Sequence, residues 1–364
     1  MSDADVLTID RLIDHVSTVP AIAGQHVDLF VRERVMDSSL DAQGKAKSGT
    51  VALFVHGGYS PSTLAFDVPY KDYSWMAFLA RQSFDVFAMD MTGYGRSVHP
   101  MMDDPRNLDP KQQDLLIPKT LQAKSEPLYP FQLVSSDSES DDINAVVDYI
   151  RKLRGVDKIT LIGWSGGGIR TGTFTVRHPG KVEKLIIHAS SNYSRENPSE
   201  RPALPQPGAP MTIQTRAVGI NQRWLNFAVA ADQIEPGVPE YIWGLNVIHD
   251  PLGATWGPGG LRAPTRTYWG WNTKSAATIK VPTLIMAGEQ DNLIASNRDL
   301  FADLGAQKKV FLSIAEATHF TAWEKQRRVL HKASLAWLRD TKLNGADQGA
   351  FHADGDGTIA SNTR

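Results

Sequence analysis

The sequence predicts an α/β fold in which a doubly wound, mostly parallel sheet carries helices on both faces. Short apolar runs that read as buried strands alternate along the chain with stretches of helical periodicity, and parallel strands need such crossover connections. The ligand and catalytic residues of such sheets lie at the carboxyl ends of the strands. The expected strands cover residues 26–35, 50–55, 84–90, 157–163, 183–189, 281–287 and 309–314.

The strand expected at 50–55 runs directly into His56-Gly57-Gly58-Tyr59. Two adjacent glycines allow backbone amides to turn toward a substrate oxygen without interference from side chains. Gly58 or Tyr59 is the expected donor, and the sequence leaves the choice between them open. His56 is expected to fasten this loop rather than to titrate in a reaction.

Residues 98–136 form a long, proline-bearing connection with little periodicity, a kind of loop that is often functional. The acidic run at 135–142 is interpreted as a helix start rather than a metal loop, because carboxylates and hydroxyls stabilise the N-terminus of a helix, here at 143–153. The ten histidines include no His-x-x-x-His pair on a helix, so neither a metal nor a cofactor is expected.

The strand expected at 157–163 leads into Gly163-Trp164-Ser165-Gly166-Gly167, the Gly-x-Ser-x-Gly pattern of a nucleophile elbow. So tight a turn strains the backbone of Ser165 and leaves no room for Cβ atoms at Gly163 and Gly167. The serine hydroxyl then lies above the N-terminus of the helix expected at 169–177, where that terminus and the Gly166 amide favour an oxyanion. Alone, the pattern also fits an ordinary strand-to-helix connection, so its partners decide the interpretation.

A serine nucleophile needs a base and an acid that orients the base, and after such an elbow they follow in the order acid, then histidine. Asp291 lies just beyond the strand expected at 281–287, and His319 lies in the loop after the last expected strand. Glu289 is a rival for the acid. Asp291 or Asn292 also fits the N-cap of the following helix.

Two other histidines follow Asp291 in the sequence. His331 falls within an amphipathic helix expected at 322–339, and His352 falls in a polar tail. Solvated surface positions are expected for both, which leaves His319 as the chosen base.

The elbow, the His-Gly-Gly loop, Asp291 and His319 together resemble the machinery of the α/β-hydrolase superfamily, over about residues 25–341. The turn Asp90-Met91-Thr92-Gly93-Tyr94-Gly95-Arg96-Ser97 is similar to a structural turn that many members carry. The resemblance implies a core at 25–191 and 276–341 and an inserted helical cap at 192–275. It also implies a catalytic triad of Ser165, Asp291 and His319 and an oxyanion hole of Gly58, Tyr59 and Gly166.

The expected cap holds five of the nine tryptophans: Trp224, Trp243, Trp256, Trp269 and Trp271. Any one of them could simply build the core of the cap. Their concentration instead predicts an apolar substrate pocket lined by Trp164, Tyr59, Trp224, Trp243 and Trp269. Residues 342–364 are small and polar and predict a disordered tail.

Composition sets further bounds. The chain has no cysteine, which excludes disulfides and thiolate sites, and its 38 basic and 40 acidic residues give a net charge of −2. No electrostatic footprint for nucleic acid or an anionic membrane results. No apolar stretch approaches the length of a membrane span, and Met1-Ser2-Asp3-Ala4-Asp5 lacks the features of a secretory signal, so a cytoplasmic protein is expected.

The leading interpretation is a serine hydrolase that cleaves a small-molecule carboxylic ester or lactone with a sizeable apolar or aromatic part through an acyl-enzyme. Serine at the elbow argues against haloalkane dehalogenases and epoxide hydrolases, which resemble this fold and carry aspartate there. Three alternatives remain: a carbon–carbon bond hydrolase, a small-peptide peptidase that binds the peptide amine through Glu235 or Glu240, and a small-molecule receptor of the same fold. The sequence leaves the natural substrate and the oligomeric state open.

Overall fold

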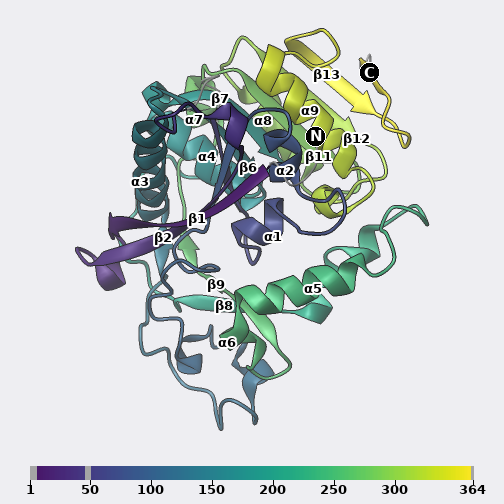
Figure 1. Ribbon diagram of the computed structural model, residues 1–364. Coiled ribbons are helices and arrows are strands. Elements are labelled where there is room, and N and C mark those ends of the chain that lie inside the picture. The colour runs from purple at the N-terminus through teal and green to yellow at the C-terminus, as the bar shows by residue number, and fades with distance from the viewer. Residues whose placement is uncertain (1–5, 46–50, 362–364) are drawn as a thin grey trace.

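A ten-stranded sheet forms the centre of the computed structural model, which describes residues 6–45 and 51–361 (Figure 1). Its strands are β1 (Val6–Val16), β2 (His26–Met36), β3 (Val51–Val55), β4 (Asp85–Met89), β6 (Ile159–Trp164), β7 (Val182–His188), β11 (Thr283–Gly288), β12 (Lys309–Ile314), β13 (Gln348–Ala353) and β14 (Ile359–Ser361). They lie in the order β1-β2-β4-β3-β6-β7-β11-β12-β13-β14. Every neighbouring pair from β4 to β13 is parallel, and β1, β2 and β14 pair antiparallel at the two ends. The predicted mostly parallel sheet is confirmed.

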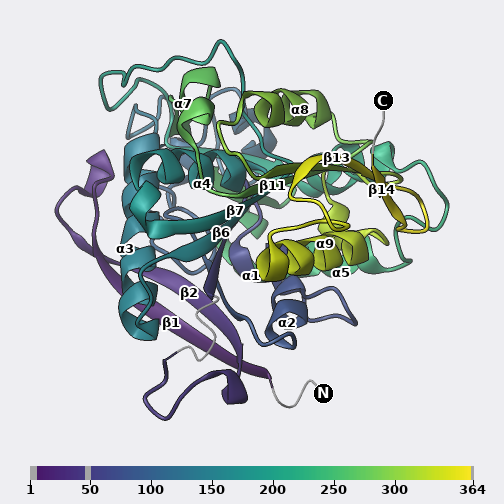
Figure 2. The ribbon, with the colours of Figure 1, turned by 90° about the horizontal axis from the view of Figure 1, so that it is seen from above.

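Helices cover both faces of this sheet (Figure 2). One face carries α1 (Ser62–Phe66), α2 (Trp75–Ala80) and α9 (Arg327–Asp340), and the other carries α3 (Ser136–Arg154), α4 (Gly166–Arg177), α7 (Thr273–Thr278) and α8 (Ile294–Asp303). Strand β3 shows why both faces are needed, because its side chains alternate between the two apolar clusters. Ala52 and Phe54 join the α1/α2/α9 side, whereas Leu53 and its neighbours two residues away join the other, all fully buried.

The amphipathic helix expected at 322–339 begins at Arg327, after a short 3-10 turn at Thr321–Trp323. His331 of this helix is not solvated as expected. It is buried between the rings of Trp75 and Phe78, and burial lowers its pKa to about 3. It is therefore a neutral core residue.

The two ends of the sheet differ from the sequence expectation. Strand β1 was not expected, and it extends the sheet by pairing with β2 over eleven residues. The expected disorder of residues 342–364 is wrong for the described part, because β13 pairs in parallel with β12 and buries Phe351 and Ala353. The described part does not include residues 1–5 or 362–364. The expectation about a signal sequence concerns residues 1–5 and so lies outside it.

The segment at 192–275 is not purely helical. It contains β8 (Met211–Thr215), a π-helical turn η7 (Ala217–Gln222), α5 (Val238–His249), α6 (Pro251–Ala254), β9 (Gly260–Pro264) and β10 (Arg266–Thr267). Strands β8 and β9 form an antiparallel pair, so part of the segment at 192–275 is a small sheet rather than the expected helices.

The long connection at 98–136 packs against the middle of that segment, 211–267, and the two together form the lower lobe in Figure 1. Its strand β5 (Val134–Ser135) pairs with β10. The side-chain amide of Gln112 accepts from the backbone N–H of Ile213 and donates to its carbonyl, both at 2.9 Å. The remaining short 3-10 turns are Pro20–Ile22, Asp37–Ser39, Pro105–Asn107, Gln113–Leu116, Pro179–Lys181 and Leu225–Phe227. No helix within the described ranges is both long and apolar enough to span a bilayer.

Candidate active site

Ser165 occupies the turn between β6 and α4 with φ 55° and ψ −119°, a conformation that residues with a side chain rarely adopt. A Cβ on Gly163 would overlap the carbonyl of Gly167, and a Cβ on Gly167 would overlap the carbonyl of Val55. Both glycines are thus required by close backbone approach, as the sequence predicts. The backbone of Ser165 is also fixed, since its N–H donates to the carbonyl of His188 at 2.9 Å.

The His-Gly-Gly loop passes directly beside this serine. A Cβ on Gly57 would lie 2.7 Å from the Cβ of Ser165 and 3.1 Å from its Oγ, so only glycine fits there. Tyr59 has φ 61°, a strained conformation of the kind that persists at functional sites. Its hydroxyl hydrogen-bonds the hydroxyl of Thr212 in β8 at 2.8 Å, which ties the loop to the lower lobe.

The loop is fastened from within, as expected for His56. The N–H of Met91 donates to His56 Nε2 at 3.1 Å, which leaves Nδ1 to donate to the carbonyl of Gly57 at 2.7 Å. Burial, and then the charge of Arg170, hold the pKa of His56 well below its ordinary value, so this imidazole is neutral.

Arg170 and Glu139, which the sequence interpretation missed, complete the support of this loop. Arg170 Nη1 donates to the carbonyl of His56 at 2.7 Å, and its Nε donates to Glu139 at 2.8 Å. Glu139 belongs to the acidic run at 135–142, which begins α3 as predicted. In the sequence, the feature that could have indicated this pair is Arg170 itself, a charged residue five positions after Ser165 on a helix expected to be largely buried.

His319 and Asp291 lie together, with 2.9 Å between His319 Nδ1 and Asp291 Oδ2. The Asp291 carboxylate is inaccessible to solvent. Burial works to raise its pKa, but the charge and hydrogen bond of His319 outweigh it, so the pKa of Asp291 lies below its ordinary value. Asp291 is therefore ionised at neutral pH and holds the ring of His319 through Nδ1.

The competing acid and base lie elsewhere. Glu289 Oε1 is 3.2 Å from Nδ1 of His352, at the edge where β13 joins the sheet. His188, another histidine near the serine, is fully buried, and burial lowers its pKa to about 4. Among the described residues, no group of three or more histidine, aspartate or glutamate side chains is arranged to hold a metal.

One cavity of about 210 Å³ brings these parts together. Ser165 and His319 both line it, as do Gly58, Tyr59, Trp164 and Gly166. The rest of its wall is largely polar and comprises Ser60, Ser191, Asn192, Gln214, Arg223, Arg266 and Phe320. The expectation of an apolar pocket is therefore wrong for the cavity beside Ser165.

None of the five tryptophans at 192–275 is among the residues that line this cavity. Trp224 is fully buried and packs on Phe320 and Trp323. Trp243 borders a small neighbouring void that shares Ser60, Gln214 and Phe320 with the cavity but contains neither Ser165 nor His319. The expected placement of Trp224, Trp243 and Trp269 in the substrate pocket is thus corrected, because Trp224 packs on core aromatic rings instead and the other two border different voids.

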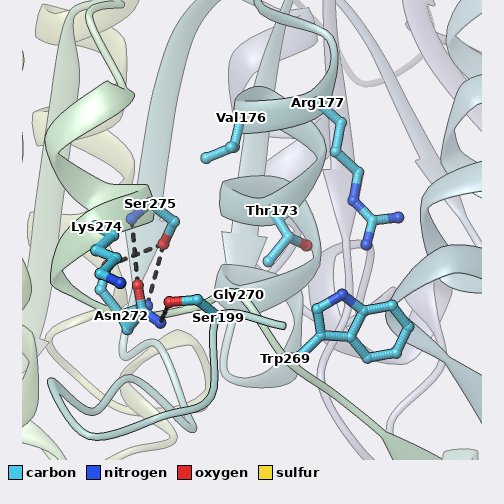
Figure 3. Close-up of a pocket in the computed structure, with 9 residues that line it drawn as sticks. All are labelled: Thr173, Val176, Arg177, Ser199, Trp269, Gly270, Asn272, Lys274 and Ser275. Atoms are coloured by element: carbon cyan, nitrogen blue, oxygen red, sulfur yellow. Dashed lines mark hydrogen bonds between the residues drawn. The ribbon is translucent and has the colours of Figure 1, made fainter. Parts of the chain in front are cut away.

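Trp269 lines a different cavity, of about 320 Å³, against the C-terminal half of α4 (Figure 3). There the guanidinium of Arg177 lies 5.7 Å from the centre of its ring, and Thr173 and Val176 project from the helix above it. Thr173 follows Gly166 by seven residues, about two helical turns. This cavity is therefore distinct from the one beside Ser165.

Trp256 and Trp271 also have structural positions. Trp256 belongs to the apolar cluster shared with residues 98–136, with Arg262 above its ring. Trp271 is fully buried, and a Cβ on Gly172 would overlap its ring.

Trp224 connects the lower lobe to the histidine loop. Its Nε1 donates to Oε1 of Glu324 at 2.9 Å. The other oxygen of that carboxylate accepts from the N–H of Thr318, the residue before His319, and Oε1 also accepts from the Thr318 hydroxyl. Burial raises the pKa of Glu324 despite these hydrogen bonds. One buried carboxylate thus fixes both the tryptophan and the loop that carries the base.

Glu324→Gln is expected to destabilise the protein by about 1–3 kcal/mol and to lower kcat, because an amide NH₂ would replace an oxygen that accepts a hydrogen bond. Trp224→Phe should affect kcat less, because it leaves the carboxylate its two bonds to Thr318, although the cavity left by the smaller ring gives a similar cost in stability, about 1–3 kcal/mol. Urea unfolding and ester kinetics measure both effects. Glu240→Gln, at an exposed ion pair with Arg216, is the control, and equal behaviour of Glu324→Gln and Glu240→Gln would contradict this role.

The turn at Asp90–Ser97 has a structural role, as expected. Asp90 is buried and accepts hydrogen bonds from the N–H groups of Ser62 and Arg96. A Cβ on Gly95 would overlap its carboxylate. The turn therefore closes the end of β4 and contributes no group to the cavity.

Comparison with known proteins identifies the class to which this architecture belongs. The family described as alpha/beta hydrolase fold matches residues 51–326, and the chain belongs to that family. No curated protein sequence matches the chain.

Solved structures share this fold at low sequence identity. A thermophilic esterase from Thermogutta terrifontis is 15% identical with a TM-score of 0.55, over 92% of this chain and 100% of that one. A bromoperoxidase from Bacillus anthracis is 14% identical with a TM-score of 0.54, over 91% and 100%. An esterase from Exiguobacterium antarcticum is 13% identical with a TM-score of 0.53, over 90% and 99%. At this identity the likeness concerns the fold alone.

Proposed function

We propose that this α/β hydrolase is a serine hydrolase that cleaves a small carboxylic ester or lactone through an acyl-enzyme. The observation that carries the proposal is that strained Ser165 and Asp291-bound His319 open into one cavity. Esterases among the structural neighbours are compatible with it.

In the proposed reaction, His319 accepts the proton of Ser165 as the serine oxygen attacks the carbonyl carbon of the substrate. Asp291 stabilises the imidazolium that forms. The amide of Gly166 and that of Gly58 or Tyr59 donate to the oxyanion. Collapse of the tetrahedral intermediate releases the alcohol, which takes the proton from His319, and water activated by the same histidine then frees the acid.

The cavity bounds the substrate. Sites for drug-sized ligands commonly measure about 300–1,000 Å³, and this one measures about 210 Å³ with a largely polar wall. A small, polar substrate fits it better than the sizeable apolar one expected from the tryptophan content.

Of the alternatives, the peptidase finds less support. A peptidase would need a carboxylate for the peptide amine, but Glu235 pairs with Lys71 and Arg327, and Glu240 pairs with Arg216. Neither lines the cavity. A receptor of this fold would retain the same groups, so its distinction from an enzyme is repeated turnover.

The test is steady-state and stopped-flow kinetics on chromogenic esters of increasing acyl length, together with lactones. We expect repeated turnover, a burst of about one equivalent of alcohol where deacylation is slow, and rates that fall as the acyl chain outgrows the cavity. A single turnover per chain would favour the receptor. The absence of hydrolysis across the whole panel would contradict the proposed function.

A further inference from the structure

Two arginines from the lower lobe reach the cavity that holds Ser165. Arg266 comes from β10, and Arg223 directly follows η7. Nη1 of Arg266 lies 3.1 Å from the point that a Cβ on Gly166 would occupy. Its guanidinium is therefore beside the residue whose amide is assigned to the oxyanion, and only 17% of its side chain is exposed.

Neither arginine has a carboxylate of its own. The nearest carboxylate to Arg266 is that of Glu139, at 3.7 Å, and the same oxygen already pairs with Arg170 at 2.7 Å. Arg223 forms no ion pair with any residue of the described ranges, and no aspartate or glutamate of that part lines the cavity. Around the cavity the guanidinium groups of Arg170, Arg223 and Arg266 outnumber the carboxylates, which are those of Glu139 and of Asp291 beside His319. The site therefore has a net positive charge.

The guanidinium of Arg266 is mostly buried, and such a group is costly unless an anion pairs with it. Arg223 is exposed and adds its charge without that cost. The planar fork of an arginine matches the two oxygens of a carboxylate. Gln214 and Asn192 on the same wall add neutral hydrogen-bonding groups. The arrangement thus has the charge and geometry of a site for an organic anion.

We propose that the substrate carries a carboxylate that binds Arg266 and Arg223, and that it lies on the acyl part of the ester. The acyl side is favoured because Arg266 adjoins Gly166, which places the charge a few bonds from the scissile carbonyl. The substrate class is then the half-esters of short dicarboxylic acids. Water cleaves the acyl C–O bond of such a half-ester to give a dicarboxylate and an alcohol. This inference rests on the proposed function for its reaction, but not for its binding site.

The first test compares pairs of esters that differ only in charge. Monomethyl glutarate is compared with methyl 4-carbamoylbutanoate, its neutral isostere, and acetoxyacetate with its amide places the charge on the alcohol side. We expect kcat/KM to favour the first charged ester by about tenfold or more, mainly through KM, and to show little preference in the second pair. The preference should shrink as salt rises from about 20 mM to about 500 mM.

Variants assign the effect to the two arginines. Arg223→Gln combined with Arg266→Gln should bring the ratio of kcat/KM for the charged ester to that for the neutral ester close to one. Arg266→Lys should keep part of the preference that Arg266→Gln loses, because lysine keeps the charge but not the planar fork. Arg216→Gln, an exposed arginine of the same segment that pairs with Glu240, should keep the full ratio. A ratio near one in the unaltered protein, or a ratio that survives the double substitution, would overturn the proposal.

Two further outcomes separate this site from the chemistry. If Arg266→Gln slowed charged and neutral esters equally, Arg266 would serve the oxyanion instead, and the proposed anion site would be wrong. Calorimetry of glutarate with the Ser165→Ala variant measures binding without turnover. We expect binding that Arg266→Gln abolishes. If no ester were hydrolysed yet this binding remained, the proposed function would fail while the anion site stood.

Discussion

Ser165→Ala is expected to lower kcat for ester hydrolysis by roughly 10⁴- to 10⁶-fold. In the proposed reaction the serine oxygen attacks the carbonyl carbon, and the strained turn places Ser165 in the wall of the cavity. Alanine at this position removes the nucleophile and keeps the Cβ. The variant should therefore fold and retain its unfolding midpoint.

Steady-state kinetics with urea unfolding checks this result. Ser199→Ala is the matched control, because it is the same substitution at a serine that lines the separate cavity beside Trp269 and not the cavity of Ser165. It should keep nearly full activity. Near-normal turnover by folded Ser165→Ala would remove the serine from the reaction.

His319→Ala is expected to reduce kcat about as severely as Ser165→Ala, because residues that act as one unit are strongly non-additive. Asp291→Asn should cost about 10⁴-fold. Asparagine preserves the shape but loses the charge that stabilises the imidazolium, and its NH₂ can face Nδ1 and select the wrong tautomer. Asp291, whose pKa lies below its ordinary value, supplies that charge throughout the neutral range.

Glu289→Gln is the control for the acid. Glu289 sits at the end of the same strand region as Asp291 but pairs with His352, so this variant should stay close to full activity. If instead Asp291→Asn were fully active and Glu289→Gln were inactive, Glu289 would be the acid.

The sheet and the positions around Ser165 were predictable because their signals are local. Each lies within a few residues of a buried strand end: the elbow after β6, Asp291 after β11 and His319 after β12. Parallel strands bring such ends to one edge of a sheet. Close backbone approach also leaves a direct trace in the sequence, as at Gly163 and Gly167.

The character of the cavity was not predictable, because it depends on contacts between distant segments. A tryptophan count does not reveal which way a ring points. Trp224 hydrogen-bonds Glu324, one hundred residues away. It therefore packs against the loop that carries His319 and does not line the cavity. The arginines gave no local pattern either, because Arg266 lies one hundred residues after Gly166 in the sequence and meets it only in the folded chain.

The expectation that residues 342–364 form a disordered tail was wrong for a related reason. The segment from Gln348 to Ala353 is short and has one large apolar side chain, Phe351, and it forms a strand because it pairs with β12 on one side and with β14 on the other. A strand that is stabilised chiefly by backbone pairing carries a weak side-chain pattern.

The role of Ser165 as a nucleophile activated by His319 is tested most directly with a fluorophosphonate probe, whose adduct is located by peptide mass spectrometry. We expect one adduct per chain, on Ser165, with loss of esterase activity in step with labelling and strongly slowed labelling in His319→Ala. An adduct on another residue, or full esterase activity in protein whose Ser165 is completely labelled, would contradict it.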